Sequence, residues 1–220
     1  KVPAGEKRIS RYSAKIPGPG FYKGTLTSAW KGGRARQTVQ VGYAPEDILP
    51  PLTKETDFQE FWDGSLARLA KVDPQYRLIH QPKLSKGAKN VYEVRMRSYG
   101  NVRVGGWYGV PKSKGPHPAI IRVPGYGANM KPVNLFDDVI VLSFNPRGHG
   151  NSQEDVKGKP GNYWIRGLDD KEGYYYQGAY LDCVRAVDFL CSRTEVDHDR
   201  IGVKGGSQGG GLSFSTAALD

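Results

Sequence analysis

The segment that most constrains this chain is a serine flanked by glycines, Gly205-Gly206-Ser207-Gln208-Gly209. It follows a short apolar stretch, residues 200–203, that predicts a strand, and it precedes residues 209–219, which predict a helix. A nucleophilic serine on such a tight turn needs glycine two positions before it and two after it. The pattern therefore predicts a nucleophile elbow with Ser207 as nucleophile and Gly205 and Gly209 as elbow glycines. A glycine-rich loop that only lets a helix pack closely on a sheet is the alternative.

The composition is that of a folded chain. Hydrophobic residues make up 38% and charged residues 25%, which excludes a disordered chain. No run of apolar residues is long enough to span a membrane. The chain begins Lys1-Val2-Pro3 without methionine, so we expect that a signal peptide has been removed or that the N-terminus is cut. This favours a secreted or periplasmic protein and leaves a cytoplasmic one open.

The net charge of +10 lies entirely in the first half of the chain. Residues 1–110 hold 19 Lys and Arg against 9 Asp and Glu, whereas residues 111–220 hold 13 of each kind. A basic half can bind nucleic acid or another polyanion. The positive residues are scattered along predicted strands, however, and no nucleic-acid-binding motif accompanies them. We therefore expect a solvated basic surface and no nucleic-acid partner.

The two cysteines indicate neither a disulfide nor a metal site. Cys183 and Cys191 are eight residues apart in one predicted helix, which separates them by about 12 Å along its axis. They belong to no Cys-x-x-Cys or Cys/His grouping, so no metal and no cofactor is predicted. We interpret both as small core residues.

Residues 1–50 predict a separate β-rich extension. Two loosely alternating segments, residues 21–30 and 34–43, are joined by Lys31-Gly32-Gly33, which is typical of a hairpin. Two strands alone are marginally stable, so we expect this hairpin to pack on further strands or on the main domain. Pro50-Pro51 marks the linker.

Residues 51–220 alternate between strand and helix patterns. Thr56 or Asp57 is expected to cap a helix that runs to about Val72, and a second amphipathic helix is expected at 175–192. The predicted strands are residues 76–80, 91–97, 103–110, 118–123, 139–144 and 200–203. This succession predicts an α/β sheet with right-handed crossovers.

Three blocks carry a resemblance to a known family. Pro124-Gly125-Tyr126-Gly127 follows one buried strand, Asn145-Pro146-Arg147-Gly148-His149-Gly150 follows the next, and a tyrosine-rich helix from Tyr174 leads to the elbow. Together they resemble the acetyl xylan esterase and cephalosporin C deacetylase family over residues 52–220. The resemblance implies the N-terminal part of an α/β-hydrolase fold, without its C-terminal strands. The first fifty residues look like the tail of a β-sandwich module.

The resemblance also implies roles for the site residues. Ser207 is the nucleophile, and the backbone N–H groups of Tyr126 and Gln208 form the oxyanion hole. A helix N-terminus beside the nucleophile favours that role independently, because its N–H groups and dipole attract negative charge.

The block that contains Arg147, Gly148 and His149 is expected to be structural. Arg147 is expected to brace its loop, with Asp182 as a suggested partner. The family usually has Gln where His149 stands, so a structural role is preferred for His149 over that of a general base.

The function implied is that of a serine esterase that removes acetyl groups from carbohydrate esters, such as acetylated xylo-oligosaccharides, through an acetyl-enzyme on Ser207. The fold orders its triad as Ser, then Asp or Glu, then His, and only Asp220 and no histidine follows Ser207. We therefore expect a piece of a longer protein that is inactive by itself and leaves residues 201–204 as an uncovered sheet edge.

Three further expectations accompany this function. The partners are a small or oligosaccharide ester and, from the resemblance, further copies of the chain. A peptidase of the prolyl-oligopeptidase type shares the elbow and is one alternative. A non-catalytic carbohydrate-binding or scaffold relative is the other.

Overall fold

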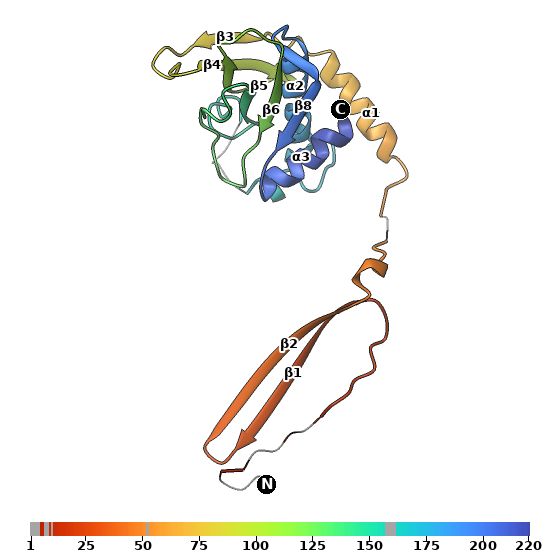
Figure 1. Cartoon of the computed structure of the whole chain (residues 1–220). Coiled ribbons are helices and arrows are strands. Elements are labelled where there is room, and N and C mark those ends of the chain that lie inside the picture. Colours follow the sequence, from red (N-terminus) through yellow and green to blue (C-terminus); the bar gives the residue numbers. More distant parts are fainter. Residues whose placement is uncertain (1–4, 7–8, 10, 52, 157–161) are drawn as a thin grey trace. The chain divides into compact units, whose positions relative to one another are not determined.

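The computed structural model describes residues 5–6, 9, 11–51, 53–156 and 162–220 (Figure 1). The chain forms two compact units, Lys1–Glu55 and Thr56–Asp220. This division falls after Glu55, whereas the sequence analysis ended the β-rich extension at residue 50. Each unit is described by itself.

The first unit contains one long β-hairpin. Strands β1 (Gly20–Trp30) and β2 (Gly33–Tyr43) pair in antiparallel fashion, and Trp30 pairs with Gly33 across the turn. A short 3-10 helix, Pro45–Asp47, follows. Nearly all side chains of both strands are exposed, so the hairpin forms without a buried face of its own. Its expected packing on further strands stays a prediction.

The second unit is built on one mixed sheet of six strands in the order β3-β4-β5-β7-β6-β8. Its strands are β3 (Arg77–His80), β4 (Lys89–Ser98), β5 (Val102–Pro111), β6 (His117–Arg122), β7 (Ile140–Asn145) and β8 (Val196–Lys204). The first four neighbours in this order pair in antiparallel fashion, whereas β7, β6 and β8 are parallel. Among the described residues β8 pairs with β6 alone, which confirms the predicted uncovered edge.

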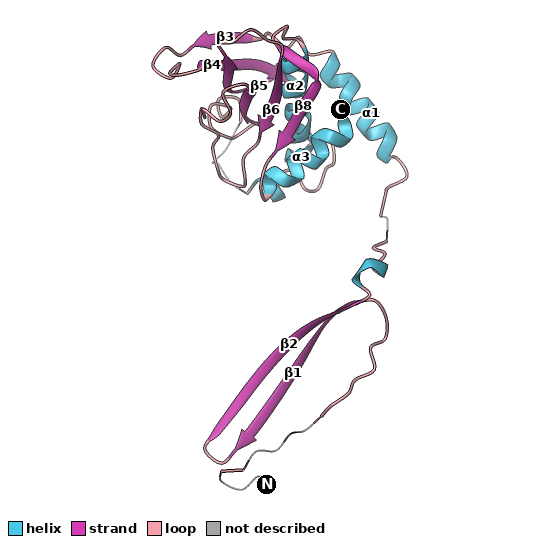
Figure 2. Cartoon of the chain, viewed as in Figure 1, coloured by secondary structure: helices cyan, strands magenta, loops and turns pink. Residues whose placement is uncertain are grey.

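Three helices accompany this sheet (Figure 2). They are α1 (Phe58–Ala70), α2 (Tyr175–Cys191) and α3 (Gln208–Leu219), and short 3-10 turns lie at Tyr99–Asn101 and Tyr163–Ile165. Helix α2 packs against β4, β6 and β8, while α3 packs against α2 and β8, and α1 against α2. None of the helices in the described ranges combines the length and the apolar character that a membrane span requires. The predicted α/β class is confirmed.

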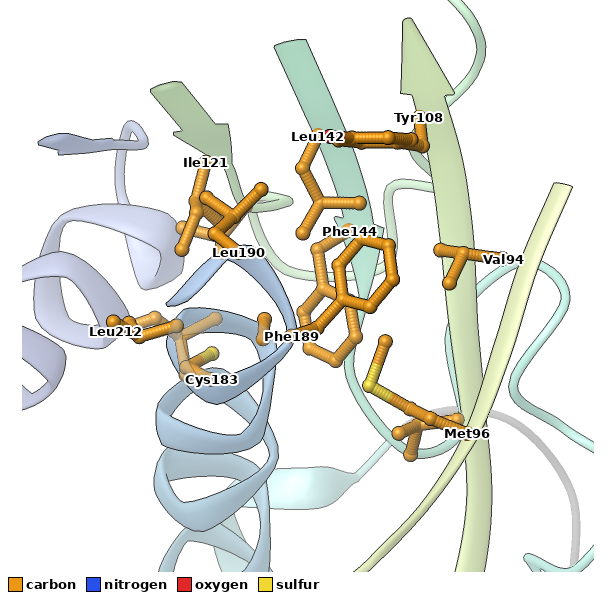
Figure 3. Packing of buried hydrophobic residues seen from close by; sticks show 14 of the residues in the cluster. Val94, Met96, Tyr108, Ile121, Leu142, Phe144, Cys183, Phe189, Leu190 and Leu212 are labelled. Atoms are coloured by element: carbon orange, nitrogen blue, oxygen red, sulfur yellow. The ribbon is translucent and has the colours of Figure 1, made fainter. Parts of the chain in front are cut away.

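The core lies between α2 and the sheet (Figure 3). Phe189 of α2 is fully buried, and its ring contacts Tyr76 and Tyr108 edge to face at centroid distances of 5.3 and 5.1 Å. In Figure 3 it lies beside Phe144 of β7. Aromatic pairs in this geometry add about 0.5–1.5 kcal/mol to the stabilisation that burial supplies. This contact therefore ties the helix to both the antiparallel and the parallel part of the sheet.

Two details differ from the expectations. Cys183 is buried as predicted, but Cys191 is exposed, because it is the last residue of α2 and lies beyond the core-facing stripe. Asp57 occupies the N-cap position of α1 without making a capping hydrogen bond. Its backbone lies outside the extended region that capping requires, and its carboxylate pairs instead with Lys171.

Replacing Phe189 with alanine should lower the free energy of unfolding by about 3–5 kcal/mol, because the change leaves a cavity between α2 and the sheet. Urea unfolding of the purified protein measures the effect. Phe214→Ala is the matched control, since Phe214 is 84% exposed on α3 and its removal should change stability by less than about 0.5 kcal/mol. Equal effects of the two substitutions would contradict the described core.

Candidate active site

Ser207 lies on the turn between β8 and α3, directly before the first residue of the helix. Its backbone has φ 55° and ψ −122°, a combination that residues other than glycine rarely adopt. Such strain persists only where the surrounding structure enforces it, and it is concentrated at functional sites. The strand, the strained turn and the helix predicted here are confirmed, whereas the role of Ser207 as nucleophile stays a prediction.

Gly205 and Gly209 occupy positions where the turn leaves no space for a side chain. A Cβ on Gly205 would lie 2.5 Å from the carbonyl oxygen of Gly209. A Cβ on Gly209 would lie 2.8 Å from the carbonyl oxygen of Val123. Both neighbours are backbone atoms, which cannot rotate away as a side chain can. The steric reason predicted for the two glycines is therefore confirmed.

The loop after β6 lies directly against this elbow. The N–H of Val123 donates to the carbonyl oxygen of Lys204, at the end of β8, over 3.0 Å. Within the described residues, the backbone N–H groups of Tyr126 and Gln208 donate no hydrogen bond. Two unpaired donors on adjoining segments, one of them at a helix N-terminus, are what a developing oxyanion requires. Their use as an oxyanion hole stays a prediction.

His149 connects the same two segments through its imidazole ring. The ring is buried; its Nδ1 lies 2.7 Å from the carbonyl oxygen of Ala128, and its Nε2 lies 3.2 Å from Nε2 of Gln208. The other end of the Gln208 side chain accepts a hydrogen bond from the Tyr176 hydroxyl at 2.9 Å. Burial lowers the pKa of His149 below its ordinary value, and the Ala128 contact opposes only part of this shift. Both ring nitrogens are thus engaged away from Ser207, which favours the structural role.

Arg147 and Asp182 form an ion pair behind the site. Nε and one terminal nitrogen of Arg147 each donate to a carboxylate oxygen of Asp182 at 2.8 Å, and the Arg147 backbone N–H adds a third bond at 2.9 Å. Asp182 is fully buried. Burial opposes the charge on Arg147, but Asp182 outweighs this and raises the pKa of the guanidinium. The suggested Arg147–Asp182 pairing is confirmed, and Gly148 follows in the braced loop.

No complete triad is present among the described residues. Asp220 is the only carboxylate after Ser207, and it follows α3, about 18 Å of helix away. His80, His117 and His198 each bond to a group four or five residues away along the chain. In the described part of the chain, no group of three or more His, Cys, Asp or Glu side chains could hold a metal ion.

Several tyrosines take part in the site although the sequence analysis assigned none of them a role. Tyr176 bonds to Gln208, the Tyr175 hydroxyl donates to the Arg147 carbonyl at 2.7 Å, and the Tyr163 hydroxyl donates to the Gly148 carbonyl at 2.8 Å. The three consecutive tyrosines 174–176 at the start of α2 could have indicated such contacts, because a buried tyrosine hydroxyl needs a hydrogen-bond partner.

Comparisons with known proteins agree on one family. The family model described as Acetyl xylan esterase (AXE1) matches residues 46–220. A curated relative, the acetyl esterase Axe7A of Xylanibacter ruminicola, is 30% identical over 217 residues, which cover 92% of this chain and 48% of Axe7A. Because the unit Lys1–Glu55 is a quarter of the chain, a match of this extent includes most of it.

Two solved structures are similar to this chain. Acetyl xylan esterase 1 from Thermoanaerobacterium sp. JW/SL YS485 is 32% identical with a TM-score of 0.67, covering 74% of this chain and 55% of its own. The acetyl xylan esterase from Paenibacillus sp. R4 is 33% identical with a TM-score of 0.67, covering 80% and 59%. The predicted α/β-hydrolase fold is confirmed. The chain spans about half the length of the curated relative it matches.

Replacing Gly209 with alanine should destabilise the protein by about 1–3 kcal/mol, because the methyl group collides with the carbonyl of Val123. Gly211→Ala in the same helix is the matched control. A Cβ there meets open space, so this change should stabilise the helix by up to about 1 kcal/mol. Urea midpoints of the two variants should move in opposite directions, and a shared direction would argue against the steric contact.

Replacing Asp182 with asparagine should cost about 3–5 kcal/mol of stability, because the buried guanidinium of Arg147 loses its counter-charge. Asp57→Asn tests an exposed pair, that of Asp57 with Lys171, and should change stability far less, because solvent screens exposed charges. Guanidinium chloride unfolding of both variants at pH 7 gives the comparison. A small loss for Asp182→Asn would show that Arg147 does not depend on this carboxylate.

Proposed function

This chain belongs to the acetyl xylan esterase family, and on that premise we propose that it supplies the nucleophile and the oxyanion hole of a serine esterase. The observation that carries the proposal is the backbone of Ser207, whose strained conformation places an exposed serine at the N-terminus of a helix. An ordinary helix-entry loop needs no such strain. The elbow therefore supports a functional serine over the purely architectural alternative.

The reaction proposed is acyl transfer through Ser207. Its Oγ attacks the acetyl carbonyl carbon, and the N–H groups of Tyr126 and Gln208 stabilise the negative charge that develops on the carbonyl oxygen. The sugar hydroxyl leaves with a proton, and an acetyl-enzyme remains on Ser207. Water then attacks this ester and releases acetate, which regenerates the serine.

The general base for this reaction is proposed to lie beyond residue 220. The acetyl esterase Axe7A is about twice as long as this chain, and the fold orders its triad so that the carboxylate and the histidine follow the serine. The histidine would take the proton of Ser207 and deliver it to the leaving oxygen. The chain is therefore proposed to contribute the nucleophile and the oxyanion hole, and the residues that follow it to contribute the general base.

The proposed substrates are acetyl esters of carbohydrates such as xylo-oligosaccharides. The relatives that share its fold and about a third of its residues are named as acetyl or acetyl xylan esterases. These names favour an esterase over the peptidase and the non-catalytic scaffold. Activity on cephalosporin C is a further proposal from the resemblance.

Ser207→Ala, made in the protein that carries this chain together with the residues that follow it, should lower kcat for p-nitrophenyl acetate by at least about 10³-fold, since no acetyl-enzyme can form. Stopped assays on acetylated xylo-oligosaccharides, with acetate as the product measured, extend the test to the proposed substrate. A proline-containing peptide substrate tests the peptidase alternative.

Ser213→Ala is the matched control in the helix that follows Ser207, where the hydroxyl donates to the carbonyl of Gly209 over 2.7 Å. This variant should keep its rate within a few-fold of the parent. Undiminished hydrolysis by Ser207→Ala would reject Ser207 as nucleophile, and hydrolysis of the peptide without that of the acetyl ester would reject the esterase.

A further inference from the structure

His149 lies between the two segments proposed to hold the oxyanion. On one side its Nδ1 contacts the carbonyl of Ala128, two residues after Tyr126. On the other side its Nε2 contacts the side chain of Gln208, whose own backbone N–H is the second donor. A neighbouring bond from the Gly150 N–H to Asn129 Oδ1, at 2.6 Å, ties the same loops together. The ring therefore links the loop that follows Tyr126 to the side chain of Gln208.

The contacts of this ring specify where its proton lies. A carbonyl oxygen only accepts hydrogen bonds, so Nδ1 of His149 must carry the hydrogen that it donates to Ala128. In a neutral imidazole Nε2 is then an acceptor, and Gln208 must present its NH₂ group to it. The Gln208 Oε1 is left to accept the Tyr176 hydroxyl, as observed. Every donor in this chain of bonds meets an acceptor.

A proton on Nε2 would break this pattern. The imidazolium would direct an N–H at the NH₂ group of Gln208, and two donors repel each other. The amide could avoid this by rotating, so that its Oε1 accepts from the imidazolium and its NH₂ donates to the Tyr176 hydroxyl oxygen, whose own hydrogen would then lose the acceptor that it has now. Gln208 is the first residue of α3, so a disturbed side chain acts directly on the residue that carries the backbone donor.

We propose that His149 is a positioning residue of the oxyanion hole, that it holds Tyr126 and Gln208 in register, and that it does so only while its ring is neutral. The proposal rests on the esterase function proposed above. His149 does not touch the reacting atoms, so it acts through the loop and through Gln208.

The surroundings of the ring favour its neutral form. Tyr163 lies against it at a centroid distance of 5.1 Å, and Tyr176 faces it through Gln208. Arg166 lies over the Tyr163 ring at 5.3 Å from its centroid, and Arg147, two residues before His149 in the chain, is paired with Asp182. Burial lowers the pKa of His149, and only the contact with Ala128 opposes this. The charged form is thus disfavoured above about pH 6.5, the ordinary value for histidine. Acidification through the lowered pKa should disrupt the network.

NMR titration of the 220-residue chain tests the network independently of catalysis. The backbone amide signals of Gln208 and Tyr126 should shift with the same midpoint as the His149 ring, below about pH 6.5. His149→Gln is the matched variant, because its amide can donate to Ala128 and accept from Gln208 without titrating. In this variant both amide signals should stay unchanged over the same range. If the amide signals of Gln208 and Tyr126 in the parent did not shift at the midpoint of the His149 ring, the proposal would be overturned.

Kinetics of the longer protein test the catalytic consequence. Below pH 6.5, log kcat of the parent should fall with pH at the steeper slope expected for two protonations, one on His149 and one on the general base. For His149→Gln the same plot should have the slope expected for one protonation. Above about pH 6.5, His149→Leu should lower kcat by at least about 10-fold with little change in KM, as expected when a transition-state contact is disturbed. This difference from the parent should shrink at lower pH, where the parent's own ring becomes charged.

The exposed His198 supplies the control, since its ring bonds to the carbonyl of Arg193, five residues earlier in the chain. His198→Gln should leave the fall of kcat below pH 6.5 unchanged. If kcat fell equally steeply below pH 6.5 in the parent and in His149→Gln, the inference would be overturned and the proposed esterase function would be unaffected. If neither the parent nor any variant hydrolysed the ester, while the amide signals still shifted with the His149 midpoint, the proposed esterase function would be overturned. The catalytic part of the inference would fall with it.

Discussion

The arrangement of the site depends on a contact between backbone atoms at Gly205 and Gly209. Because neither residue has a side chain, the end of β8, the start of α3 and the loop after β6 come within van der Waals distance of one another. A single methyl group at either position would meet a carbonyl oxygen, and backbone cannot rotate aside. The close packing of the segments that carry Tyr126 and Gln208 therefore depends on the absence of a side chain at these two positions.

The ion pair of Arg147 and Asp182 adds a second constraint on the loop after β7. Removing two charges from water is costly, and such a pair is stable only when its geometry is good and its remaining donors are satisfied. Here two parallel hydrogen bonds, a backbone bond and a contact with the Tyr99 carbonyl meet that condition. The pair therefore positions the following residues, and it brings His149 to the loop and to Gln208.

Elements whose signals are local could be predicted from the sequence. The strand expected at 118–123 is found at His117–Arg122, and the elbow follows from the space that a tight turn leaves. Apart from the suggested Arg147–Asp182 pair, interactions across long sequence separations could not be predicted. His149 meets Ala128 and Gln208, 21 and 59 residues away, only because three segments converge. Asp57 fails as a cap for the same reason, since Lys171, 114 residues later, competes for its carboxylate.

The environment that suits His149 for positioning also prevents it from acting as a general base toward Ser207. Its Nε2 lone pair already accepts the Gln208 amide, and its Nδ1 hydrogen is held by Ala128. Burial further disfavours the imidazolium that a base must become during catalysis. A proton leaving Ser207 would thus find no acceptor on this ring. Activation of the serine must come from a group outside this network, while the network itself maintains the donors that receive the oxyanion.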